Sequence, residues 1–177
     1  MTTSTPESHP AFHKVPHEPN PIAPSGDGTF VVEFRSAKMI ITLELLASLP
    51  QTEYSDCYVA STGHAKSGPY RFEGVTLRDV LTAAGVPPKA EAKVKISGAD
   101  GYEVEVSTEP ENAPAGSPSP LLATQRDGVK LTREQGLVRV IVPTETEDAL
   151  LQLKWIKTIR VHSVEDENEN VTQLTSP

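Results

Sequence analysis

Apolar and polar positions alternate in many short segments of the chain, and this pattern predicts a domain built mainly of β-strands. Successive side chains of a strand point to opposite faces, and β-branched residues favour strands. The predicted strands are Thr29–Phe34, Lys38–Thr42, Tyr54–Ala60, Ala92–Ile96, Glu103–Ser107, Leu121–Thr124, Val129–Leu131, 137–142 and 156–162. The strands Leu121–Thr124 and Val129–Leu131 flank Arg126-Asp127-Gly128, which is typical of a hairpin turn.

Two short segments follow a helical pattern instead. Leu43–Leu49 has Thr42 in front of it as a capping residue. A second helix is expected from Thr76 to Ala84, where Thr76 and Asp79 resemble a capping box. Glycine and proline predict loops over 61–73 and 108–120. Many strands with two short helices indicate a β-rich α+β fold.

The segment 137–142 is unusual because it places a cation inside an apolar strand. In a strand, Leu137, Arg139 and Ile141 share one face, and the three valines between and after them share the other. Both faces are therefore mostly apolar, and the guanidinium of Arg139 still needs an anion or water. This arrangement favours an anionic ligand at Arg139.

Composition limits the class of protein. The chain has 177 residues, 37% of them apolar, which suffices for one domain with a core. A formal net charge of −8 argues against binding to nucleic acid. No apolar run is long enough to span a membrane, and no secretory or lipidation signal is apparent, so we expect a cytoplasmic protein that does not bind membranes. The single cysteine, Cys57, excludes an internal disulfide.

The termini differ in composition from the middle of the chain. Residues 1–28 are rich in proline, serine, threonine and histidine, which predicts a disordered arm. Residues 163–177 are mostly acidic and polar and are expected to form a tail. The predicted domain occupies residues 29–162, a length usual for a single domain.

An ordered set of motifs resembles a known family, the molybdopterin-binding domain of the sulfite-oxidase-like oxidoreductases. The motifs are Phe72-Glu73-Gly74-Val75-Thr76-Leu77-Arg78-Asp79-Val80-Leu81, Asp100-Gly101-Tyr102, Leu121-Leu122-Ala123, Asp127-Gly128-Val129-Lys130-Leu131, Leu137-Val138-Arg139-Val140-Ile141-Val142-Pro143 and Lys154-Trp155-Ile156. The resemblance covers about residues 38–162. It implies a β-rich mixed-sheet fold and a molybdenum–molybdopterin cofactor.

The resemblance also implies which residues form the site. In that family a cysteine thiolate binds molybdenum, and basic side chains hold the phosphate of the pyranopterin. Cys57 is then the metal ligand, while Arg139 and Lys154 are the phosphate ligands and Arg71 is a further cation of the site. His64, in the loop after Cys57, is expected to meet cofactor or substrate. A thiolate is a suitable ligand for a metal held by pterin sulfurs, and arginine and lysine suit a phosphate.

Each of these residues also has a structural explanation. A lone cysteine is commonly a small buried hydrophobe, and Ser61 is an alternative at the ligand position. Arg139 is equally explained by an ion pair with a nearby carboxylate. Lys154 is also explained as an ordinary solvated lysine whose stem lies on apolar surface. Arg71 and His64 are also explained as exposed surface residues.

Three functions follow from these observations. The first is a molybdenum-dependent oxidoreductase that transfers an oxygen atom or electrons to or from a small-molecule substrate or a redox partner protein. The second is a cofactor-free binding module on the same scaffold, favoured by Glu145, Glu147 and Asp148, which would repel a phosphate. The third is an accessory subunit that recruits a partner through its terminal arms.

Overall fold

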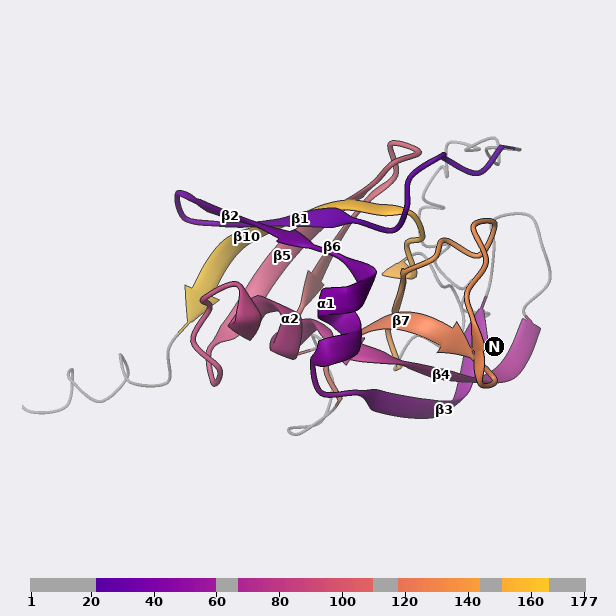
Figure 1. Cartoon of the computed structure of the whole chain (residues 1–177). Coiled ribbons are helices and arrows are strands. Elements are labelled where there is room, and N and C mark those ends of the chain that lie inside the picture. Colours follow the sequence, from indigo (N-terminus) through magenta and orange to yellow (C-terminus); the bar gives the residue numbers. More distant parts are fainter. Residues whose placement is uncertain (1–21, 60–66, 110–117, 144–150, 166–177) are drawn as a thin grey trace, which may run out of the picture.

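The computed structural model describes residues 22–59, 67–109, 118–143 and 151–165, and the structural statements below concern these residues. They form two β-sheets and two short helices (Figure 1). The arm predicted over 1–28 and the tail predicted over 163–177 lie mostly outside the described residues, and both stay predictions.

The first sheet has five strands in the order β2-β1-β10-β5-β6 (Figure 1). Their bounds are β1 Phe30–Phe34, β2 Ala37–Ile41, β5 Glu91–Gly98, β6 Glu103–Ser107 and β10 Ile156–Glu165. β1 and β10 pair in parallel, whereas the other neighbours are antiparallel. The sheet is therefore mixed, and the predicted β-rich α+β fold is confirmed.

The second sheet carries Cys57, Arg71 and Arg139. Its order is β3-β4-β7-β8, and β9 pairs with β7. The bounds are β3 Thr52–Val59, β4 Ser67–Thr76, β7 Leu121–Arg126, β8 Val129–Lys130 and β9 Arg139–Ile141. β7 and β8 form the predicted hairpin, with Asp127 and Gly128 both at positive φ.

Both predicted helices form, and both use the predicted caps. The helices are α1 Leu43–Ser48 and α2 Leu77–Ala83. Thr42 Oγ1 accepts a hydrogen bond from the Leu45 amide at 3.2 Å. Thr76 Oγ1 accepts from the Asp79 amide at 3.1 Å and donates to the Asp79 carboxylate at 2.6 Å. The side chains of these threonines therefore satisfy amides that a helix start leaves unpaired.

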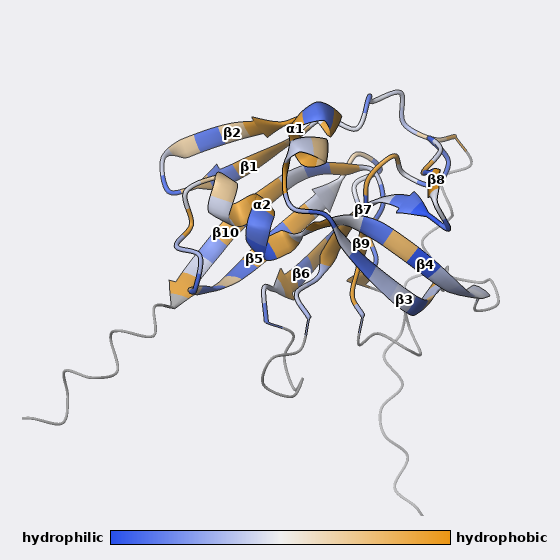
Figure 2. Ribbon diagram, turned by 60° about the horizontal axis from the view of Figure 1, so that its bottom comes forward, coloured by the Kyte–Doolittle hydropathy of each residue, from blue (hydrophilic) through white to orange (hydrophobic). Residues whose placement is uncertain are grey.

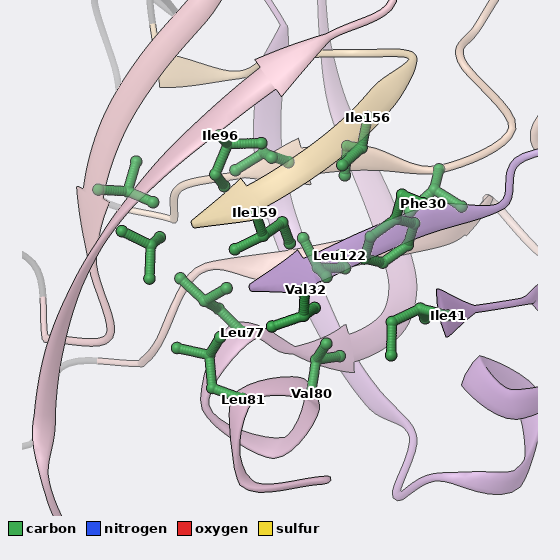
Figure 3. Packing of buried hydrophobic residues seen from close by; sticks show 14 of the residues in the cluster. Phe30, Val32, Ile41, Leu77, Val80, Leu81, Ile96, Leu122, Ile156 and Ile159 are labelled. Carbon is green, nitrogen blue, oxygen red and sulfur yellow. The ribbon is translucent and has the colours of Figure 1, made fainter. Parts of the chain in front are cut away.

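The main core joins the two sheets and the helices. Phe30, Val32 and Ile159 from the first sheet pack with Leu77 and Leu81 of α2 (Figure 3). Val75 and Leu122 bring the inner face of the second sheet to the same cluster. Along several strands, hydrophilic and hydrophobic residues alternate, as expected where one face is buried (Figure 2).

A second cluster lies on the other face of the second sheet. Its members are Cys57, Val59, Phe72, Leu121, Ala123, Leu131 and Ile141. Neighbouring residues of β7 and β9 thus divide between the two cores: Val140 belongs to the main core and Ile141 to the second cluster. Both faces of β9 are therefore buried in apolar surroundings, which agrees with the apolar pattern predicted for 137–142.

Two sequence predictions of secondary structure were wrong. The loop predicted over 61–73 is a strand from Ser67 onward, because β4 pairs with both β3 and β7 and this pairing outweighs Gly68 and Pro69. The strand predicted over 137–142 is shorter, since Leu137 has a positive φ of 56° and regular pairing covers only β9. β10 extends to Glu165, beyond the strand predicted over 156–162.

Candidate anion-binding site

Arg139 lies on β9 with its side chain on the face of the second cluster. Its strand partner on β7 is Ala123, a member of that cluster, and Ile141 two residues later points the same way. The Nε atom of Arg139 is buried and has no hydrogen-bond partner among the described residues. A buried guanidinium nitrogen without a partner is energetically unfavourable, so an acceptor that reached this atom would stabilise it.

The charges around Arg139 are positive. Burial and, to a smaller extent, the nearby Arg126 together lower the pKa of Arg139 to about 10. None of the ion pairs formed by the described residues includes Arg139. The ion-pair explanation of Arg139 therefore receives no support in the described part of the chain.

Lys154 faces Arg139 across an isolated antiparallel bridge. Beside this bridge, the Val140 amide donates a hydrogen bond to the Leu153 carbonyl oxygen at 2.8 Å, which holds the two segments together. Burial lowers the pKa of Lys154, Arg139 lowers it further, and Asp100 opposes the shift. The ammonium nitrogen donates to the carbonyl oxygen of Glu134 at 3.3 Å. It is therefore not a freely solvated lysine, and its partner there is a neutral carbonyl.

Trp155 gives the Lys154 ammonium an aromatic wall. The nitrogen lies 3.9 Å from the centroid of the indole ring, in cation–π contact. The indole Nε1 donates to the carbonyl oxygen of Arg133 at 2.6 Å, which fixes the ring. Gly136 allows the backbone at residue 136 to lie close to Lys154, because a Cβ on residue 136 would lie 2.7 Å from the Cβ of Lys154.

Arg126 is a third cation that the sequence reasoning missed. It pairs with Phe72 across β4 and β7, so its side chain leaves the sheet on the face of the second cluster. Its guanidinium lies 4.6 Å from the centroid of the Tyr70 ring. A register shift between Glu73 and Gly74 interrupts the β4–β7 pairing. Because of this shift, the simple alternation of side chains along β7 does not predict the face on which Arg126 lies.

Cys57 is a buried thiol of the second cluster. Its side chain is 7% exposed, and Sγ lies 3.7 Å from the Tyr54 carbonyl oxygen and 3.6 Å from that of Ser55. Burial raises the pKa of the thiol, and the neighbouring Asp56 raises it further. These surroundings favour the neutral thiol and disfavour the thiolate that binds metals.

The other predicted residues are not brought to Arg139. Arg71 points to the face of β4 opposite Phe72, and its Nε lies 3.5 Å from the Glu53 carboxylate on the surface. His64 and Ser61 lie outside the described residues. Within the described ranges, no group of three or more histidine, cysteine, aspartate or glutamate side chains is placed to hold a metal ion.

Comparison with known families agrees with this architecture. The family model for the oxidoreductase molybdopterin-binding domain matches residues 31–170, most of the chain. The chain belongs to this family, and the resemblance read from the motifs is confirmed. No curated protein matches the chain. None of the helices among the described residues is long and apolar enough to cross a membrane.

The described residues fit the phosphate end of a molybdopterin better than its metal-binding end. A phosphate is matched by the unpartnered Nε of Arg139 and by the Lys154 ammonium, whose contacts in the described part of the chain include a carbonyl oxygen and an aromatic ring. A molybdenum ligand is not matched by Cys57, because its sulfur is packed as a neutral thiol among apolar side chains.

Proposed function

We propose that this domain binds a molybdopterin-type cofactor through its terminal phosphate at Arg139 and Lys154. Membership of the family supports a pterin ligand. The single observation that carries the proposal is the buried, unpartnered Nε of Arg139 on an otherwise apolar face. An anion there would satisfy this donor and relieve the repulsion among Arg139, Lys154 and Arg126.

The three cations have different tasks in this proposal. Arg139 offers a planar fork that suits two phosphate oxygens, whereas Lys154 acts as a single point charge. Arg126 adds positive potential from β7. When bound, the cofactor supplies a molybdenum centre for oxygen-atom or electron transfer, with a small-molecule substrate or a redox partner protein as the second reactant. The protein residues bind and orient the cofactor.

A second candidate function is anion binding without metal chemistry. The buried, neutral state of Cys57 supports it, because the chain has only this one cysteine. In this case the scaffold and the Arg139–Lys154 site are retained, and ligation of molybdenum by a thiolate is not. The cofactor-free binding module is a different alternative, favoured by Glu145, Glu147 and Asp148 because they would repel a phosphate; these three residues lie outside the described residues.

One assay separates the two candidates. Full-length protein is purified from cells that make the molybdenum cofactor, and its pterin and molybdenum contents are measured. Pterin with molybdenum supports the oxidoreductase function, and pterin without molybdenum supports the second candidate. Absence of pterin contradicts the proposed cofactor. The matched variants are Arg139→Gln and Lys154→Gln, both of which should lose pterin if the phosphate is held at this site.

A further inference from the structure

The turn formed by residues 132–137 touches both the N-terminal segment and the Arg139–Lys154 site. On one side, Arg133 Nη1 donates to the carbonyl oxygens of Pro24, at 3.1 Å, and Gly26. We call residues 24–28 the N-terminal strap. The strap also meets the end of the turn, because a Cβ on Gly28 would lie 3.3 Å from the Cβ of Leu137.

On its other side the turn supplies the carbonyl groups that hold the site. The Arg133 carbonyl accepts from the indole of Trp155 at 2.6 Å, and the Glu134 carbonyl accepts from the ammonium of Lys154 at 3.3 Å. Two consecutive residues of one turn thus fix two consecutive residues of the site. Movement of this turn would shift the indole and the ammonium together.

We propose that Arg133 is a positioning residue for the anion site: it ties the turn to the N-terminal strap and so fixes Trp155 and Lys154. This inference rests on the proposed function, because it concerns the same site. Its physical basis is preorganisation. A lysine side chain loses considerable freedom when it binds an anion, and a fixed ring and carbonyl reduce that loss beforehand.

Loss of the Arg133 side chain should leave the turn itself folded. The side chain of Arg133 is exposed, so its removal takes little apolar area from the core. The turn also has its own hydrogen bonds, from the Thr132 amide to Gln135 Oε1 at 2.9 Å and from the Gln135 amide to the Thr132 carbonyl at 3.1 Å. The turn therefore keeps internal support without the guanidinium of Arg133, which links it to the strap.

The chain contains one tryptophan, Trp155, so its fluorescence reports directly on this site. The full-length protein is titrated with inorganic phosphate at constant ionic strength and, separately, with base to follow ionisation of Lys154. Arg133→Ala should weaken phosphate binding by about tenfold, the effect of leaving one long side chain unfixed. It should also raise the midpoint of the Trp155 pH titration, because Lys154 becomes more solvated.

Two further variants make the result specific. Arg133→Lys keeps a donor for the strap carbonyls and should recover part of the phosphate affinity. Lys130→Ala removes an exposed positive charge on the adjoining β8 strand and should leave both readouts unchanged. Unchanged phosphate affinity and an unchanged pH midpoint in Arg133→Ala, with the fold intact by thermal unfolding, would overturn the positioning role.

Arg139→Gln distinguishes failure of this inference from failure of the proposed function. If Arg139→Gln binds phosphate as tightly as the wild type, the anion site itself is wrong, and the role of Arg133 is wrong with it. If Arg139→Gln loses the phosphate response while Arg133→Ala retains wild-type behaviour, only the positioning role is overturned. Loss in both variants, with partial recovery in Arg133→Lys, supports both proposals.

Discussion

Arg139 and Lys154 lie opposite each other in an antiparallel bridge, and the charge of Arg139 lowers the pKa of Lys154. The pKa of Arg139 is lowered to about 10 mainly by burial, and the pKa of Lys154 is lowered by burial and by Arg139. Two cations placed together in this way favour an anion between or beside them. Family membership supports our proposal that this anion is a cofactor phosphate.

Phosphate binding should weaken as the pH rises through about 10. A bound anion favours the charged forms of Arg139 and Lys154, so binding is strongest where both are protonated. Because both pKa values are lowered, the loss begins at a lower pH than for ordinary side chains. Phosphate affinity is measured by Trp155 fluorescence between about pH 8 and 10.5, where the charge of phosphate is nearly constant. Constant affinity across this range contradicts a site made by these two cations.

Cys57→Ala should reduce the free energy of unfolding by about 1 kcal/mol, because it removes a small buried group from the second cluster. It should leave phosphate affinity unchanged, since among the described residues the sulfur contacts backbone carbonyls and packs in the apolar second cluster. Denaturant unfolding and the phosphate titration provide the two measurements. In the native wild type, the thiol should react with a thiol reagent far more slowly than after unfolding. Rapid native reaction, or loss of phosphate binding in the variant, contradicts the account of a core thiol.

Stability should also depend on pH through Cys57. Its pKa is raised in the folded state above the ordinary value of 9.0. Between the unfolded and folded pKa values the native state binds more protons, so stability is fully present below about pH 9 and decreases as the pH rises further. The unfolding midpoint is compared with that of Cys57→Ala over this range. The variant should lose less stability than the wild type, and parallel curves would show that Cys57 does not contribute.

Gly74→Ala should destabilise the domain by about 3 kcal/mol, the upper part of the usual range for overpacking. A Cβ at Gly74 would lie 2.7 Å from the Cα of Ala123 and would also strike the Leu122 carbonyl oxygen. Both neighbours belong to the backbone of β7, so they cannot move aside as a flexible side chain does. The matched control is Gly26→Ala, where nothing lies within 4 Å of the added carbon. Equal unfolding temperatures for the two variants would refute the close contact between β4 and β7.

Much of the fold is legible in the sequence because its signals are local. The caps at Thr42 and Thr76 depend on one residue each, and the hairpin at Asp127 and Gly128 depends on a short turn motif. The strand β4 was missed because its pairing with β3 and β7 is distant in sequence and outweighs the local glycine and proline signal. Local sequence signals do not show that pairing between distant strands will outweigh a nearby glycine and proline.

The site was predictable only in part for the same reason. Arg139 and Lys154 stand in recognisable motifs, whereas Arg126 reaches the same face through a register shift that alternation does not reveal. The positioning role that we propose for Arg133 depends on hydrogen bonds to backbone carbonyls of the strap and on its own carbonyl oxygen. Contacts made through the backbone leave no pattern of residue types in the sequence. The role of His64 stays a prediction, and so does the cytoplasmic location.

The central claim is that Arg139 holds the cofactor phosphate, and pterin retention by matched arginine variants tests it most directly. Full-length wild type, Arg139→Gln and Arg71→Gln are purified in parallel from cells that make the cofactor, and the pterin per protein is measured. Arg71 is a suitable control because it is an exposed arginine on the opposite face, beside Glu53. We predict that wild type and Arg71→Gln retain pterin and that Arg139→Gln retains about one-tenth or less, as expected for loss of a charge-assisted contact. Equal pterin in Arg139→Gln and Arg71→Gln, or none in the wild type, would contradict the claim.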